Sequence, residues 1–74
     1  MNANGPQIKA GRLLLGWARM TLALNAHVSL AQIVCFETGK TLSLHLGVRL
    51  QRALEAAGVE FIGKTDVLIR EAAE

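Results

Sequence analysis

The stretch that decides the fold runs from Gly16 to Lys40, GWARMTLALNAHVSLAQIVCFETGK. Its apolar residues recur at helical spacing in two stripes, which predict one short helix over residues 18–26 and a second over residues 30–38. Ser29 precedes the second helix as a good N-cap, because its hydroxyl oxygen can accept from free backbone N–H groups. Two short helices joined by a tight turn predict a helix-turn-helix unit, whose second helix usually enters the DNA major groove.

The flanking sequence predicts three further elements and a tail. Residues 7–15 read as a first helix and residues 1–6 as a disordered tail, so residues 7–74 form a single domain. Residues 43–57 are expected to be a fourth helix, although residues 41–50 also alternate as a strand would. Two runs rich in branched and aromatic side chains, at 59–62 and 67–70, predict a β-hairpin. The expected fold class is mainly α, with four helices and a C-terminal hairpin.

Composition excludes several function classes. The 74 residues suffice for one small core, and no apolar run approaches the roughly 20 residues that span a membrane. Cys35 is the single cysteine, which fits a reducing cytoplasm, and no ligand spacing indicates a metal site. The chain has neither a glycine-rich phosphate loop nor a nucleophile with a base. We therefore expect a cytoplasmic protein that is not an enzyme and has no cofactor.

Charge is distributed unevenly along the chain. Residues 1–52 contain six basic residues and one acidic residue, whereas residues 53–74 contain two basic and five acidic residues. A basic N-terminal part suits a polyanion such as double-stranded DNA, and the acidic end should face away from it. The alternative is a solvated surface of mixed sign.

The hairpin raises the question of what it packs against, since an isolated two-stranded hairpin is only marginally stable. Pairing with a second copy would give a four-stranded sheet across a two-fold axis and a homodimer. The residues expected at that interface are Val59, Phe61, Val67 and Ile69. The alternative is a hairpin that closes its own core.

Taken together, residues 8–41 resemble the XRE family of helix-turn-helix regulators, which includes the lambda repressor and Cro proteins. The matching positions are Ile8, Arg12, Leu15-Gly16, Leu22-Ala23, Ala26, Val28-Ser29, Ile33, Phe36-Glu37 and Gly39-Lys40. Residues 50–61, LQRALEAAGVEF, further resemble a bacterial subgroup of short XRE proteins that end in β-strands and are often found on mobile elements. The resemblance implies a lambda-repressor-like domain that regulates transcription as a nucleoid-associated homodimer.

The resemblance also implies roles for individual residues. Arg12 and Glu37 match a pair that forms a buried ion pair. Arg19 matches a position at the DNA backbone, and Lys40 with Thr41 matches a loop that contacts phosphates from the other side. The expected DNA-binding set is Arg19, Ser29, Leu30, Ala31, Gln32, Cys35, Lys40 and Thr41.

The chain departs from the family pattern at several positions. His27 stands where the turn usually has glycine, and Ala18 stands at a helix start that is usually polar. The face expected to read bases is apolar: Leu30, Ala31, Val34 and Cys35, extended by Met20 and Leu24. It can read thymine methyl groups while Gln32 pairs with adenine, or it can bind another transcription regulator as an antagonist or co-regulator, or it can be covered by a second copy. DNA binding is the leading hypothesis.

Overall fold

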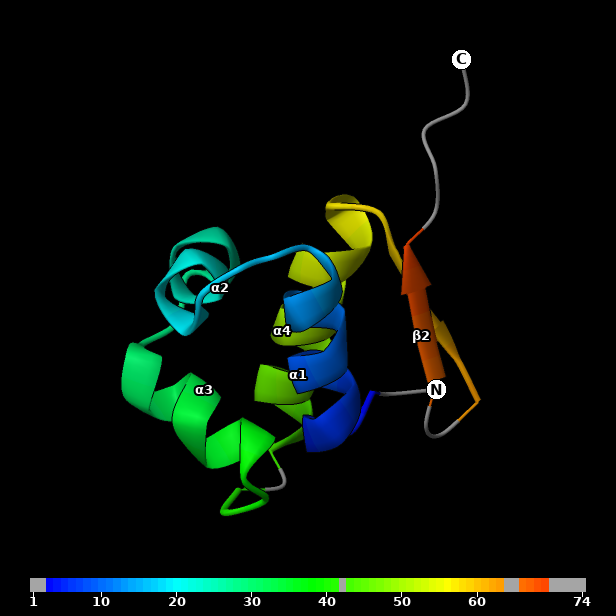
Figure 1. The fold of residues 1–74 in the computed structure, drawn as a ribbon. Coiled ribbons are helices and arrows are strands. Elements are labelled where there is room, and N and C mark those ends of the chain that lie inside the picture. The colour runs from blue at the N-terminus through cyan, green and yellow to red at the C-terminus, as the bar shows by residue number, and fades with distance from the viewer. Residues whose placement is uncertain (1–2, 42, 64–65, 70–74) are drawn as a thin grey trace.

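Side-chain caps and left-handed residues set the limits of the helices. A computed structural model describes residues 3–41, 43–63 and 66–69, and Figure 1 shows four helices followed by a two-stranded antiparallel hairpin. The elements are α1 (Gly5–Leu14), α2 (Arg19–Ala26), α3 (Leu30–Glu37), α4 (Leu44–Ala56), β1 (Val59–Ile62) and β2 (Asp66–Ile69). The predicted mainly-α fold is confirmed at this level, with helix limits shifted by one or two residues. The second strand begins one residue earlier than predicted, at Asp66, and is described as far as Ile69, since Arg70 lies outside the described residues.

The start of α1 corrects the predicted tail. Asn4 caps the helix, since its side chain accepts from Gln7 N while the Gln7 side chain accepts from Asn4 N. Ala3 is buried, and its N–H donates to Gln51 Oε1 on α4 at 2.7 Å. The prediction of a disordered tail over residues 1–6 is therefore wrong for residues 3–6, because the capping box begins the helix two residues earlier. Met1 and Asn2 lie outside the described residues.

The turn between α2 and α3 sets a steep angle between the two helices. His27 adopts the left-handed conformation (φ 58°, ψ 46°), and Val28 N–H donates to Ala23 O at 3.1 Å, closing the end of α2. The histidine thus takes the conformation expected of it, one that few non-glycine residues adopt. The chain bends by 112° between the two helices. Among the described residues no single helix is long and apolar enough to cross a membrane, and α2 with α3 meets that test only as this bent pair.

The core lies where all four helices and the hairpin meet. Ile8, Leu22, Ile33, Leu50 and Leu54 are fully buried. They are joined by smaller or slightly more accessible apolar side chains: Ala3, Ala23, Ala26, Phe36, Leu46 and Val59. Each helix therefore contributes one apolar stripe to a shared core, as the periodicity predicts.

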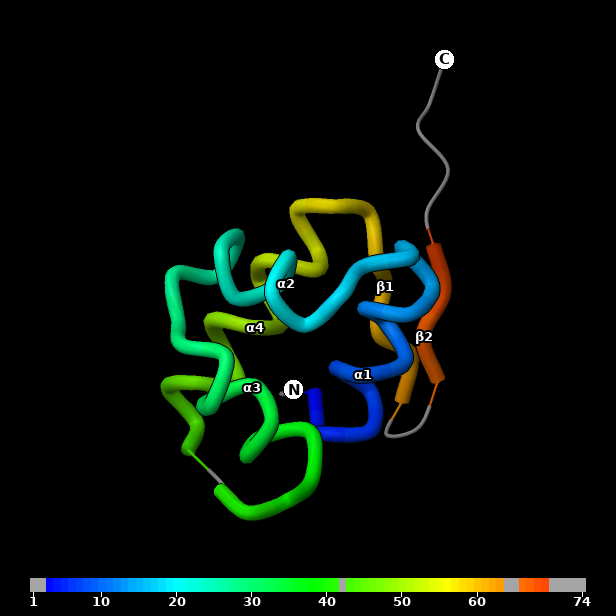
Figure 2. The backbone as a smooth tube through the Cα atoms, turned by 60° about the vertical axis from the view of Figure 1, so that its left-hand side comes forward, coloured from blue at the N-terminus to red at the C-terminus, as the bar shows by residue number. Residues whose placement is uncertain are grey.

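The hairpin packs on α1, and both views show β2 beside that helix (Figures 1 and 2). Its register pairs Val59 with Ile69 and Phe61 with Val67. The buried amide of Gln7 ties the turn to α1, since its Nε2 donates to Gly63 O at 3.1 Å and to Asp66 O at 3.3 Å. The hairpin therefore closes the core of its own chain.

That packing corrects three of the four predicted dimer residues. Val59 is buried in the core, and Phe61 and Val67 are partly buried against it. Side chains alternate across a strand, so these residues share the face that meets the helices. Ile69 remains 42% exposed at the end of β2. A second copy would have to reach the free edge or the outer face of the hairpin.

Candidate nucleic-acid interface

Helix α3 presents one face to the core and the other to solvent. Ile33, Phe36 and Glu37 are buried. Leu30, at 41% exposure, and Ala31 are exposed, and Val34 and Cys35 are half-buried. All of these outward side chains are apolar or weakly polar, so the apolar face expected from the sequence is present on the surface of the folded chain.

The first turn of α3 is held by a reciprocal pair of hydrogen bonds. Ser29 Oγ accepts from Gln32 N at 3.1 Å, and Gln32 Oε1 accepts from Ser29 N at 2.9 Å. This capping box satisfies two backbone donors at the helix start. The predicted N-cap is confirmed, and the structure adds that the Gln32 side chain is folded back onto the backbone. Sequence spacing contained this signal, because serine followed three residues later by glutamine is the capping-box pattern.

Glu37 is the electrostatic centre of the unit, although it lies at the end of α3. Arg12 on α1 binds it with two hydrogen bonds, from Nε to Oε2 at 2.8 Å and from Nη2 to Oε1 at 3.1 Å. Its remaining Nη1 donates to Trp17 O at 2.9 Å. The predicted ion pair is confirmed, and the Glu37 side chain is fully inaccessible to solvent.

A second arginine shares the same carboxylate. Arg19, the first residue of α2, donates from Nε to Glu37 Oε1 at 3.0 Å, and its side chain is 37% exposed. Burial alone would raise the pKa of Glu37, but the hydrogen bonds and charges of the two arginines outweigh burial and lower that pKa below 4.5. The sequence does not predict this contact, which brings the start of α2 to the end of α3.

The predicted phosphate contact by Arg19 is therefore modified. Its Nε is bound to Glu37, so only the outer part of the guanidinium is available to a ligand. Ala18 provides no side-chain cap, which leaves backbone donors at the start of α2 beside that guanidinium. Two arginines around one carboxylate carry a net positive charge. This corner thus combines fixed positive charge with backbone donors.

The loop after α3 carries the other predicted basic contact. Gly39 is left-handed (φ 78°), its N–H donates to Phe36 O, and Lys40 N–H donates to Cys35 O at 2.8 Å. These two bonds form the Schellman ending expected of a helix that stops at glycine. The Lys40 side chain is exposed. Thr41 Oγ1 accepts from Ser43 N at 3.4 Å, and Leu42 lies outside the described residues.

The start of α4 forms part of the same surface, which the sequence does not predict. A hollow of about 310 Å³ lies beside the outward side of α3, and a second of about 260 Å³, lined by Val28, Gln32, Ser43, His45, Leu46 and Arg49, adjoins it. Arg49 also donates from Nη1 to His27 O at 3.2 Å, which ties α4 to the turn. A shallow depression thus follows α3 and is bordered by the start of α4.

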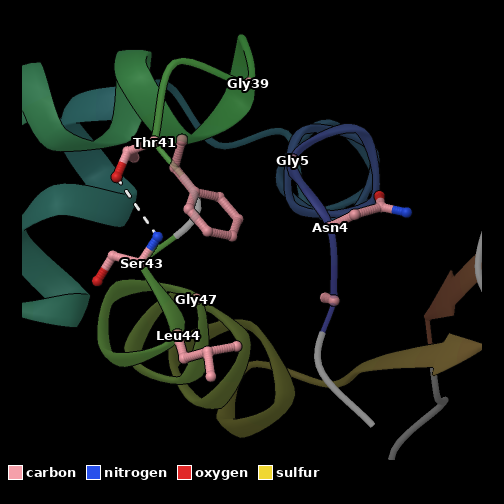
Figure 3. Close-up of a pocket in the computed structure, with 9 residues that line it drawn as sticks. Asn4, Gly5, Gly39, Thr41, Ser43, Leu44 and Gly47 are labelled. Atoms are coloured by element: carbon pink, nitrogen blue, oxygen red, sulfur yellow. Dashed lines mark hydrogen bonds between the residues drawn. The ribbon is translucent and has the colours of Figure 1, made fainter.

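A further apolar hollow of about 300 Å³ lies between the starts of α1 and α4 and the end of α3 (Figure 3). Phe36, Leu44 and three glycines line it, together with Ala3, Asn4, Thr41 and Ser43. Gly5 lies so close to α3 that a Cβ there would be 2.4 Å from Phe36 O. Its described lining contains no charged side chain, and Thr41 is its only residue from the predicted DNA-binding set.

The apolar surface continues from α3 onto α2. Met20 and Leu24 are 52% and 69% exposed and lie one turn apart. Exposed apolar surface of this kind usually marks a binding site. No protein-family model matches the chain and no curated protein matches it significantly, so what this surface binds must be inferred from its residues.

Proposed function

We propose that this chain is a sequence-specific DNA-binding transcriptional regulator with a lambda-repressor-like helix-turn-helix, and that α3 enters the major groove. The observation that supports this most is the 112° bend between α2 and α3 across a three-residue turn, with one face of α3 left open. Helix-turn-helix units join their helices at about 90–120° by turns of this length. Steep crossing lets α3 project from the domain while α2 spans the DNA backbone.

The distribution of charged side chains around α3 also supports DNA as the ligand. Arg19 and Lys40 both stand near the C-terminal end of α3, and the exposed Arg49 stands near its start, at places where DNA strands would pass. Glu37, the only acidic residue before residue 53, is buried and paired. The described acidic residues beyond it are at the end of α4 and in the hairpin, and Figures 1 and 2 place the hairpin on the side away from α3. The surface around α3 is therefore free of exposed carboxylates among the described residues.

The proposal is tested by the salt dependence of binding to duplex DNA selected from a random-sequence pool. Lys40→Ala and Arg19→Ala should each weaken binding to all sequences alike and lower the slope of log K against log salt by about one. Lys9→Ala removes an exposed cation of α1 and serves as the charge-matched control. Unchanged affinity and slope in both test variants, or no enrichment of any duplex at low salt, would contradict the proposal.

The proposed regulator acts as a homodimer, because half-sites on DNA mirror a two-fold axis. Among the described residues β2 pairs with β1 alone, so its other edge is open to a second strand. Antiparallel pairing of two such strands about Leu68 brings the Leu68 residues of the two copies together at the two-fold axis.

A second candidate function is favoured by Leu24, the most exposed large apolar side chain on α2 or α3. In this alternative the surface of Met20, Leu24 and Leu30 binds another transcription regulator. Two variants, Ala31→Glu and Leu24→Glu, distinguish DNA binding from binding of another regulator. A DNA reader loses binding with Ala31→Glu and keeps most of it with Leu24→Glu, whereas a protein-binding surface centred on α2 is lost with Leu24→Glu.

A further inference from the structure

The outward face of α3 has almost none of the side chains that usually read bases by hydrogen bonds. Every residue of α3 is described, and its single charged residue, Glu37, is buried. What faces solvent is Leu30, Ala31, Val34 and Cys35, with Gln32 at the edge. Base-specific hydrogen bonds come mainly from arginine, lysine, asparagine and glutamine. Only Gln32 belongs to that group.

The polar side chains beside this face are engaged by the helix itself. Gln32 Oε1 accepts from Ser29 N, so bidentate pairing with adenine would draw Gln32 away from the capping box. Thr38 Oγ1 donates to Val34 O at 2.7 Å, at the other end of the helix. The surface between these two ends is therefore apolar, and its hydrogen-bonding neighbours stabilise α3.

Charge complementarity identifies the occupant of this face as a polyanion. Arg19 and Lys40 lie near the C-terminal end of α3, Arg49 lies near its start, and the carboxylate of Glu37 is enclosed between two arginines. An apolar strip between cations matches the major groove, where phosphates flank base edges that carry methyl groups. Thymine presents a C5-methyl group there, and 5-methylcytosine presents the same group at the same position.

We infer that α3 recognises its DNA through C5-methyl groups in the major groove, by apolar contact with Leu30, Val34 and Cys35. This inference rests on the proposed DNA binding and names the chemistry of that site. Burying one methyl group changes affinity by about fourfold. Since thymine carries the methyl group on one strand only, such contacts distinguish T·A from A·T as well as from C·G. Several contacts of this size give a moderate sequence preference added to phosphate binding.

The test uses the duplex most enriched from a random-sequence pool, synthesised with thymidine and again with deoxyuridine. Deoxyuridine keeps every hydrogen-bonding group of thymidine and lacks only the methyl group. Wild-type protein should bind the deoxyuridine duplex more weakly, by about fourfold for each contacted position. Replacing a contacted thymine by 5-methylcytosine, with guanine opposite, should bind more tightly than unmethylated cytosine by a similar factor.

Side-chain variants assign the contact. Leu30→Ala, Val34→Ala and Cys35→Ala should each reduce the ratio of thymidine to deoxyuridine affinity at one position, as coupled partners do. Leu24→Ala removes a more exposed apolar side chain from α2 and should leave this ratio unchanged.

The outcomes separate this inference from the proposed function. If no duplex is enriched at low salt, DNA binding itself is wrong. If an enriched duplex binds equally well with thymidine and deoxyuridine, DNA binding stands and methyl recognition is wrong. A methyl effect that all three α3 variants leave unchanged would also overturn the inference, because the methyl group would then act through DNA shape.

Discussion

Glu37 shows how one side chain can hold three helices. Its carboxylate is fully enclosed and accepts hydrogen bonds from Arg12 on α1 and Arg19 on α2. A buried charge without partners costs several kcal/mol, so the arginines are required by the carboxylate and also position it. Because Arg19 is fixed at its Nε, its exposed part would lose less freedom on binding the phosphate that we propose it contacts.

The lowered pKa of Glu37 predicts a loss of stability in acid. The unfolded group titrates near 4.5 and the folded group lower, so its contribution is complete above pH 4.5 and disappears as pH falls through the folded pKa. Urea denaturation of wild-type protein between pH 7 and strongly acidic pH measures this loss. Arg19→Met removes one donor and should make the acid-dependent loss smaller, because the folded pKa then lies closer to 4.5.

Glu55→Gln, at an exposed position of α4, is the control and should retain the wild-type loss. Parallel curves for wild type and Arg19→Met would show that the second arginine does not stabilise the carboxylate.

The sequence predicted the residue contacts that follow from residue type or from the family resemblance. It did not predict the contact that depends on the angle between two helices. The Ser29 cap, the left-handed His27 and the pairing of Arg12 with Glu37 all followed from residue type or resemblance, and all three are confirmed. The bond between Arg19 and Glu37 depends on the angle that the turn sets between α2 and α3. No pattern of spacing specifies that angle closely enough to place a guanidinium within 3.0 Å of a carboxylate.

Among the four helices, α2 is the one whose N-terminus has no side-chain cap. Asn4, Ser29 and Ser43 cap the other three helices with side-chain oxygens, whereas Ala18 makes no such bond. Ala18 already has the extended conformation of an N-cap (φ −73°, ψ 160°). The backbone donors of α2 are thus left to solvent or to a ligand.

Ala18→Ser should therefore stabilise the folded chain. A serine hydroxyl at an N-cap contributes about 1 kcal/mol, which raises the melting temperature of a domain of this size by about 4–8 °C. Ala56→Ser, at an exposed helical position, is the matched control and should lower stability slightly. Thermal unfolding followed by circular dichroism distinguishes them. Equal effects of the two serines would mean that α2 gains nothing from a cap.

Elements were predictable where one residue marks their limit. Gly39 ends α3 and Gly58 ends α4, both with positive φ, and the helix limits agree with prediction there to within two residues. The predicted start of α1 is two residues late because the reciprocal bonds between Asn4 and Gln7 extend the helix to Gly5. The face of the hairpin was misassigned because alternation shows that two faces differ, and does not show which one meets the helices.

In the whole molecule, the surface around α3 and the hairpin lie on opposite sides of α1 (Figures 1 and 2). Leu68 and Ile62 are exposed on the outer face of the hairpin, and Ile69 is exposed at its end. An apolar strand with an open edge is prone to pairing with another chain. A second copy in a defined register would satisfy that edge and leave both α3 faces open.

The residue at the proposed two-fold axis makes this register testable. Leu68→Lys should prevent dimer formation, because two lysines would then oppose each other across the axis, and mixing this variant with Leu68→Glu should restore it. Sedimentation analysis of each variant alone and of the mixture measures the outcome. Leu44→Lys introduces the same change at an exposed position of α4 and should leave assembly unchanged. Monomeric wild-type protein, or a mixture no better associated than either variant alone, would contradict the pairing.

The bond between Gln7 and the hairpin has a consequence for synthesis of the chain. The first helix emerges from the ribosome early, but the acceptors of its amide, Gly63 O and Asp66 O, emerge more than fifty residues later. Until then the side of α1 that packs on the hairpin stays uncovered, and the nascent chain exposes apolar surface to chaperones and proteases. A premature stop codon before the hairpin should therefore yield a product that is degraded rather than a smaller folded domain.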